Sequence, residues 1–198
     1  MVNDYTQSGE QAVILANCGE PGIFIDIGAN DGVTFSNTRA LVDLGWSGVY
    51  VEPGIAAFSK LKENLPNSMA YRIAISDQDG EALFHESDEA SRYMLSSLVD
   101  AERQRWSASY GFGTITVKTM TVETFLEHSG LNLVDFISID AEGADLMIFR
   151  QFDLSGLGVQ LCCVEHNGRS LTDFDAHATS HGMRRIFHNA ANCIYARQ

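Results

Sequence analysis

Two kinds of apolar pattern alternate along the first part of the chain. Dense apolar runs rich in β-branched residues recur at 23–27, 49–51 and 71–75, and such runs are typical of strands buried on both faces of a sheet. Between them, apolar residues recur at helical spacing over 36–45 and 58–65. This order of strand, helix and strand predicts a parallel sheet with right-handed crossovers.

The second half continues the alternation and then changes it. Apolar runs at 134–139 and 159–164 predict two more buried strands, and a helical stripe at 146–149 lies between them. Two final runs, 183–187 and 193–195, are separated by a polar turn and predict an antiparallel hairpin. The predicted fold class is therefore α/β, with a mostly parallel sheet and a C-terminal antiparallel hairpin.

The remaining segments are less regular. Ser8 followed by Gln11 has the form of a capping box and predicts a helix within residues 1–20. Residues 80–120 combine two short strand signals with a polar stretch, and we interpret them as a variable region that covers the substrate or packs on the core. Because no repeat or linker interrupts the chain, we expect a single domain over residues 1–198.

Charge limits the partners that this chain is expected to bind. Thirteen basic residues stand against 26 acidic ones, for a net charge of −13 that repels nucleic-acid phosphates and anionic membranes. No signal-peptide pattern opens the chain, and no apolar run reaches the roughly 20 residues that cross a bilayer, so we expect a cytoplasmic protein. The edge of the closing hairpin is compatible with a monomer or a homodimer.

A glycine-containing loop follows the first predicted strand, with the sequence Asp26-Ile27-Gly28-Ala29-Asn30-Asp31-Gly32. Glycine at 28 and 32 lets the backbone turn tightly and approach a ligand closely. The spacing differs from the Gly-x-Gly-x-x-Gly of dinucleotide sites, and the carboxylates of Asp26 and Asp31 would repel a pyrophosphate. A ligand with a cationic amino-acid end fits better, and an ordinary glycine turn is the alternative.

An acidic residue stands where a ribose would bind. Glu52 ends the second predicted strand, about 20 residues after the loop, where one carboxylate can accept both hydroxyls of an unphosphorylated ribose. A solvated strand-end glutamate is the alternative. Ala74 and Ile75 end the third apolar run, where small side chains and backbone groups can receive an adenine.

Several segments, in order along the chain, resemble a known family. They are Ser8-Gly9-Glu10, 24–32, Ser36-Asn37-Thr38, 45–48, Val51-Glu52-Pro53, 74–77, 139–145 and Val164-Glu165-His166. These resemble the FkbM-type methyltransferases of the class I S-adenosylmethionine fold, with Ala141 where the family often has valine. The resemblance implies a Rossmann-like sheet, S-adenosylmethionine as cofactor and methyl transfer to an acceptor.

The resemblance also implies how the cofactor is held. Its methionine part would bind the segment around Gly28, its ribose Glu52, and its adenine the segment around Ala74. Ser36 and Asn37 would reach the cofactor's carboxylate, although a helix N-cap explains Ser36 equally well. The full expected set is Asp26, Gly28, Asn30, Asp31, Ser36, Asn37, Glu52, Ala74, Ile75 and Asp140.

Acidic residues and a histidine follow the last two parallel strands. Asp140 and Glu142 come after 134–139, and Glu165 and His166 come after 159–164, so their strand ends should face one pocket. Methyl transfer from a sulfonium requires positioning, and removal of a proton when the acceptor is a hydroxyl. We expect catalysis from Asp140, Glu142 and His166, with His166 as the base; a purely structural histidine is the alternative.

The same residues also offer ligands to a metal ion. Asp140, Glu165 and His166, or Asn167 in place of the histidine, are similar to the magnesium site of catechol-type O-methyltransferases. A divalent cation there would bind two vicinal oxygens of the acceptor and lower the pKa of one of them.

The leading hypothesis is O-methylation of a small-molecule acceptor such as a sugar or secondary metabolite. An N-methyltransferase, an NAD-dependent oxidoreductase and a catalytically silent cofactor-binding partner domain remain as alternatives. Aromatic and basic residues of the middle region suggest a cover for an acidic or sugar-like acceptor, or else packing over the core. They are Trp106, Tyr110, Phe112, Arg92, Arg103 and Arg105.

Overall fold

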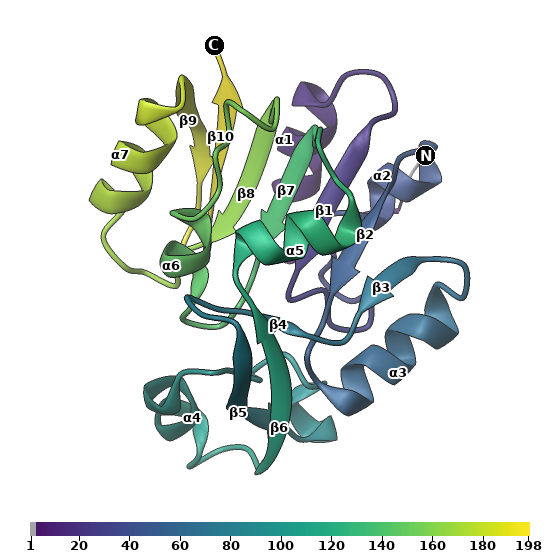
Figure 1. The fold of residues 1–198 in the computed structure, drawn as a ribbon, viewed down its shortest axis with the longest axis vertical. Coiled ribbons are helices and arrows are strands. Elements are labelled where there is room, and N and C mark those ends of the chain that lie inside the picture. The colour runs from purple at the N-terminus through teal and green to yellow at the C-terminus, as the bar shows by residue number, and fades with distance from the viewer. Residues whose placement is uncertain (1–2) are drawn as a thin grey trace.

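Seven strands form the main sheet, in the order β3-β2-β1-β7-β8-β10-β9 (Figure 1). The computed structural model describes residues 3–198. Neighbouring strands from β3 to β8 run parallel, and β10 is antiparallel to both β8 and β9. The predicted parallel sheet with a C-terminal hairpin is confirmed. Its strands are β1 (Ile23–Ile27), β2 (Ser47–Val51), β3 (Met69–Tyr71), β7 (Phe136–Ile139), β8 (Leu161–Glu165), β9 (Met183–His188) and β10 (Asn192–Arg197).

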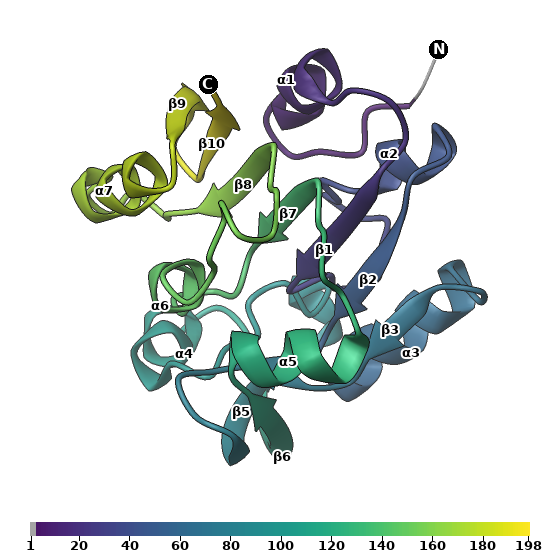
Figure 2. The ribbon, with the colours of Figure 1, turned by 45° about the horizontal axis from the view of Figure 1, so that its top comes forward.

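Helices cover both faces of this sheet (Figure 2). Alternate side chains of β1 point to opposite faces: Phe24 packs in the apolar cluster with Ile14 and Leu41, whereas Ile25 packs with Phe125 and the residues of the other face. Burying each such side chain stabilises the fold by about 1.5–3 kcal/mol. The helices are α1 (Glu10–Asn17), α2 (Arg39–Asp43) and α3 (Ile55–Asn64) on one face, and α5 (Val122–Ser129), α6 (Asp145–Phe149) and α7 (Thr172–Ser180) on the other.

A three-stranded sheet lies beyond the carboxyl ends of the parallel strands (Figure 1). It contains β4 (Ala74–Ile75), β5 (Gly80–Ser87) and β6 (Phe112–Met120). The two short strands expected within residues 80–120 are present in β5 and β6, which pair with each other in antiparallel register. Between these two strands the chain forms a 3-10 turn (Glu89–Ser91) and α4 (Asp100–Trp106).

The expectation of one strand over residues 71–75 is wrong. β3 ends at Tyr71 in the main sheet, whereas β4 begins at Ala74 and pairs with β6 in the small sheet. Both halves are apolar because each is packed against the core, so the pattern does not reveal that the chain changes sheet between them.

The N-terminal helix is present as α1, but its expected capping box is wrong. Gly9 is the N-cap residue with a left-handed φ of 88°, and no side chain caps it. The Gln11 N–H donates to Thr6 Oγ1 (3.2 Å) rather than to Ser8, while the Ser8 N–H donates to Glu10 Oε2 (2.8 Å). Within residues 3–198, no helix has the length and apolar character that a membrane crossing requires.

Candidate active site

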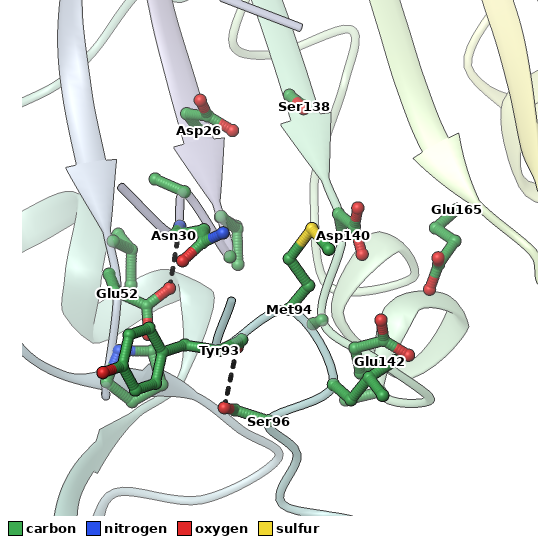
Figure 3. Close-up of a pocket in the computed structure, with 18 of the residues that line it drawn as sticks. Asp26, Asn30, Glu52, Tyr93, Met94, Ser96, Ser138, Asp140, Glu142 and Glu165 are labelled. Carbon is green, nitrogen blue, oxygen red and sulfur yellow. Dashed lines mark hydrogen bonds between the residues drawn. The ribbon is translucent and has the colours of Figure 1, made fainter. Parts of the chain in front are cut away.

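A cavity of about 300 Å³ opens where β1, β2, β7 and β8 end. Figure 3 shows Asn30 and Glu52 on one side of it, and Asp140, Glu142 and Glu165 on the other. The rest of the wall comes from the small sheet and from residues 93–106, which lie between β5 and β6. One cavity therefore collects most of the residues that the sequence singled out.

Gly28 brings two strand ends into direct backbone contact. Its φ is 79°, and a Cβ at this position would lie 1.7 Å from the carbonyl oxygen of Asp140. The N–H groups of Gly28 and Ala29 both donate to Val51 O, at 2.9 and 3.1 Å. Only glycine fits here, and it fixes the loop after β1 against the ends of both β2 and β7.

Asp26 lies at the bottom of the cavity and is 4% exposed. Thr38 Oγ1 donates to Asp26 Oδ2 at 2.6 Å. Burial raises the pKa of Asp26 to about 6, although hydrogen bonds from Thr38 and Ser138 oppose the rise. The carboxyl group is held by the protein itself and places negative potential beneath the loop.

Glu52 ties the end of β2 to the loop after β1. Its Oε2 accepts from the Asn30 N–H (2.9 Å) and its Oε1 from the Gly54 N–H (2.7 Å). Burial nevertheless raises the pKa of Glu52 to about 7. Beside it, Asn30 has a left-handed φ of 48°, and its Oδ1 is buried without a hydrogen-bond partner. These two residues offer free acceptor capacity on one wall of the cavity.

The other residues expected at the cofactor divide into two groups. Ser36, Asn37, Ala74 and Ile75 line the cavity, and Asn37 Nδ2 also donates to Ser138 Oγ (3.2 Å). Asp31 does not line it. Its carboxylate accepts from the Val33 N–H (2.9 Å), the Thr34 N–H (2.7 Å) and the Thr34 hydroxyl (2.7 Å), so it orders the loop instead.

Four carboxyl groups lie close together on the opposite side: Asp140, Glu142 and Glu165 line the cavity, and the fully buried Asp145 lies behind them. Oxygens of Asp140, Asp145 and Glu165 lie within 4.8 Å of one another. Burial, followed by repulsion among these groups, raises the pKa of Asp140 to about 7 and that of Glu142 to about 9. The pKa of Glu165 is raised further for the same reasons, and its Oε2 is buried without a partner.

Asp145 and Arg169 complete this cluster, and our sequence reasoning missed both. Asp145 Oδ1 accepts from the Ala141 N–H (2.7 Å), and its Oδ2 accepts from the Gly143 N–H (2.9 Å) and faces Arg169 Nη1 at 3.4 Å. In the sequence Asp145 looks like an ordinary acid in the first turn of a helix. Its position five residues after Asp140, within one strand-to-helix loop, was the available signal.

The structure places His166 away from the cavity, contrary to its expected role as base. Its Nδ1 accepts from the Gly168 N–H (3.1 Å), and its Nε2 lies 3.1 Å from Asn189 O. Both ring nitrogens are thus occupied by backbone groups. His166 follows Glu165 directly, so the two side chains leave the strand in opposite directions, and Glu165 is the one that lines the cavity.

The donor set fits a metal ion poorly. With His166 turned away, Asp140, Glu165 and the alternative ligand Asn167 remain of the expected set, and the carboxylate grouped with the two acids is that of Asp145. Asn167 Nδ2 lies 3.5 Å from Glu142 Oε2, so its amide is directed at a carboxyl group. Both oxygens of Asp145 already accept backbone N–H bonds, and the guanidinium of Arg169 beside it would repel a cation. Arg169 thus supplies positive charge that a divalent ion would otherwise bring.

The fold is a Rossmann-like sheet that ends in an antiparallel hairpin. Its cavity lies at the carboxyl edge, between a glycine loop after β1 and an acid at the end of β2. Together these features are those of the class I methyltransferase fold. The chain belongs to the FkbM methyltransferase family, since the model of the methyltransferase FkbM domain matches residues 26–192. The expected family is therefore confirmed.

The chain is similar to the 2-O-methyltransferase NoeI of Sinorhizobium fredii, at 29% identity over 146 residues. The match covers 68% of this chain and 58% of the length of NoeI. Among solved structures, it is similar to the N-terminal domain of human METTL16 in complex with SAH, with a TM-score of 0.50 and 12% identity over 94% of this chain and 66% of the other. The same human domain in a second structure also gives 0.50 and 12%, over 96% and 66%. These structural likenesses confirm the class I fold.

Proposed function

We propose that this protein transfers the methyl group of S-adenosylmethionine to a hydroxyl oxygen of a small-molecule acceptor, such as a sugar or secondary metabolite. The observation that carries the proposal is the group of carboxyls around Asp140, across the cavity from Glu52 and Asn30. A base beside the acceptor is required for a hydroxyl, whose proton must leave as the new bond forms. The printed name of NoeI, a 2-O-methyltransferase, supports oxygen as the methylated atom.

The cofactor half of the cavity is the wall formed by the ends of β1, β2 and β4. Glu52 and Asn30 would receive the ribose hydroxyls, and Ala74 and Ile75 the adenine edge. Ser36 and Asn37 would face the amino-acid end, with Asp26 beneath it. When bound, the cofactor supplies an electrophilic methyl group on a sulfonium, which is a good leaving group and needs no acid.

Asp140 is the base in this proposal. It lines the cavity and its pKa is raised to about 7, which suits a general base near neutral pH. The proton of the acceptor hydroxyl passes to the Asp140 carboxylate while the oxygen takes the methyl group. A hydrogen bond from Glu165 lowers the pKa of Asp140, so a protonated Glu165 would stabilise its carboxylate form. Glu142 lies at the same wall and would contact the acceptor.

The first experiment is calorimetric titration with S-adenosylmethionine, S-adenosylhomocysteine and NAD. We expect binding of both adenosyl compounds and none of NAD, because Asp26 places a carboxyl group beneath the glycine loop, where a pyrophosphate would need cationic or N–H partners. Binding of NAD alone would support an oxidoreductase, and binding of neither would support a silent domain.

The second experiment tests the base and the metal together. Asp140→Asn should lower the rate of methyl transfer by about 10²- to 10⁴-fold, with the affinity for S-adenosylhomocysteine changed far less. The exposed Glu63 of α3 offers a control, Glu63→Gln. Because Arg169 already balances the carboxyl cluster, transfer by the unmodified protein should persist in EDTA. A loss of transfer that Mg²⁺ restores would contradict this reading, and transfer to amines alone would contradict O-methylation.

A further inference from the structure

Trp106 is the last residue of α4 and lines the cavity. Its indole N–H is buried and has no hydrogen-bond acceptor. A buried donor without a partner costs about 1–3 kcal/mol. The ring is held by its neighbours, since Tyr110 packs against it edge-on at 6.4 Å and the Arg105 guanidinium lies 5.1 Å from its centroid. A fixed aromatic side chain with an unused donor is a feature of ligand-binding walls.

Two contacts fasten the wall formed by residues 93–106 to the catalytic side of the cavity. Ser97 Oγ donates to Glu142 O at 2.6 Å. Arg169 Nη2 donates to Glu102 Oε1 at 2.6 Å, while Nη1 of the same guanidinium faces Asp145. The position of Trp106 is therefore set relative to the loop that carries Asp140.

The charges around this wall favour an acceptor without negative charge. Arg103 pairs with Asp100 (2.8 Å), and Arg105 lies 3.4 Å from Glu102, so acids within α4 balance its basic residues. The carboxyl groups across the cavity would repel an anion. The sequence-based suggestion that these arginines attract an acidic acceptor is thus not favoured, and the sugar-like alternative remains.

Resting on the proposed O-methylation, we propose that Trp106 binds the acceptor and that this acceptor contains a neutral pyranose ring. The C–H face of such a ring packs against the edge of the indole that carries Nε1, and Nε1–H, which lies in the plane of the indole, donates to one of the ring's oxygens. Across the cavity, Glu142 and Asn167 offer acceptors and a donor to vicinal hydroxyls, of which one faces Asp140. The apolar C–H face of a pyranose thus matches the aromatic wall at Trp106, and the hydroxyls at its rim match the polar wall at Glu142 and Asn167.

The chain has two tryptophans, which allows a direct test by fluorine NMR. Protein labelled with 5-fluorotryptophan should give two resonances, and Trp106→Phe assigns one of them by its loss. Trp46 is the internal reference, because it is buried in the cluster of Phe24 and Leu41 and does not line the cavity. With S-adenosylhomocysteine at saturation, a panel of neutral methyl hexopyranosides and methyl 6-deoxyhexopyranosides should include at least one that shifts the Trp106 resonance and leaves that of Trp46 in place.

No shift of the Trp106 resonance with any neutral pyranoside would overturn the proposal, as would a shift given only by a uronic acid glycoside. Failure to bind S-adenosylhomocysteine would instead count against the proposed function, so the two failures are distinguishable. With a pyranoside that is methylated, Trp106→Phe should raise the KM for that acceptor about tenfold, as expected for one lost hydrogen bond. The kcat and the affinity for S-adenosylhomocysteine should change less than threefold, and Trp46→Phe should leave all three values unchanged. An unchanged KM in Trp106→Phe would overturn the role of its N–H.

Discussion

Each carboxylate oxygen of Glu52 accepts one backbone N–H, from Asn30 and from Gly54, and keeps a second lone pair. An ionised Glu52 can thus shape the loop and accept ribose hydroxyls at the same time. Because both oxygens must accept hydrogen bonds, glutamine, which has the same size but only one such oxygen, cannot replace Glu52.

We predict that Glu52→Gln weakens binding of S-adenosylhomocysteine at least tenfold. The glutamine NH2 would face one of the two N–H donors, so one loop contact and one acceptor for the ribose are lost. Calorimetric titration measures the change, with Glu63→Gln as the matched control on an exposed site. Equal dissociation constants for the Glu52 variant and the unmodified protein would show that this carboxylate does not bind the cofactor.

The contrast between Glu52 and His166 shows what the sequence reveals at the scale of single residues. The distance from the glycine loop was enough to predict that Glu52 lines the cavity, because strand ends meet at one edge. Whether Glu165 or His166 faces that edge depends on the register of β8, since neighbouring side chains alternate. The free Oδ1 of Asn30 and the role of Asp145 depend on backbone angles and loop contacts that spacing does not encode.

At the scale of elements, the contact between the loop after β1 and the end of β7 is the most constrained part of the sheet. We predict that Gly28→Ala lowers the free energy of unfolding by more than 3 kcal/mol, roughly the size of a severe core defect. The added Cβ meets the Asp140 carbonyl at 1.7 Å, and the left-handed φ adds strain. Urea unfolding measures the difference.

Gly130 provides the control for that experiment. It ends α5 with a similar φ of 72°, but a Cβ there would meet no atom within 4 Å. Gly130→Ala should therefore cost only about 1–2 kcal/mol, from the left-handed conformation alone. Equal losses in the two variants would mean that backbone angle, and not the contact with Asp140, makes Gly28 necessary.

The order of elements was predictable from the sequence, and the positions at which they end were predictable only in part. Burial on both faces makes β1 and β7 apolar runs that are interrupted only by Asp26 and Ser138, and the hairpin has a polar turn, so each was visible. The break between Tyr71 and Ala74 was not visible, because Tyr71 and Ile75, on its two sides, pack in one apolar cluster. The placement of α4 depends on tertiary contacts such as Glu102 with Arg169.

For the whole molecule, the buried carboxyl groups make stability depend on pH. The pKa of Asp26 is raised from 3.8 to about 6, that of Glu52 from 4.5 to about 7, and that of Asp140 from 3.8 to about 7. Between about pH 4 and pH 7 the folded protein binds more protons than the unfolded chain, so stability falls as pH rises.

We predict that the free energy of unfolding of the ligand-free protein is at least about 2 kcal/mol lower at pH 7.5 than at pH 5, since one pKa unit corresponds to about 1.4 kcal/mol. Urea unfolding at the two pH values tests this. Glu52→Gln should reduce the difference, because it removes one of the groups whose pKa is raised, whereas Glu63→Gln should not. A stability that rises over this interval would mean that these groups are ionised in the folded protein.

Under the proposed function, the residues that hold the cofactor and the aromatic contact to the acceptor come from separate stretches of this chain. The cofactor wall and Asp140 belong to strand ends that backbone contacts hold together, whereas Trp106 and its neighbours belong to one segment between β5 and β6. Such an arrangement favours evolutionary diversification. Exchange of that one segment between paralogues would alter the aromatic contact to the acceptor and leave the residues of the proposed reaction in place.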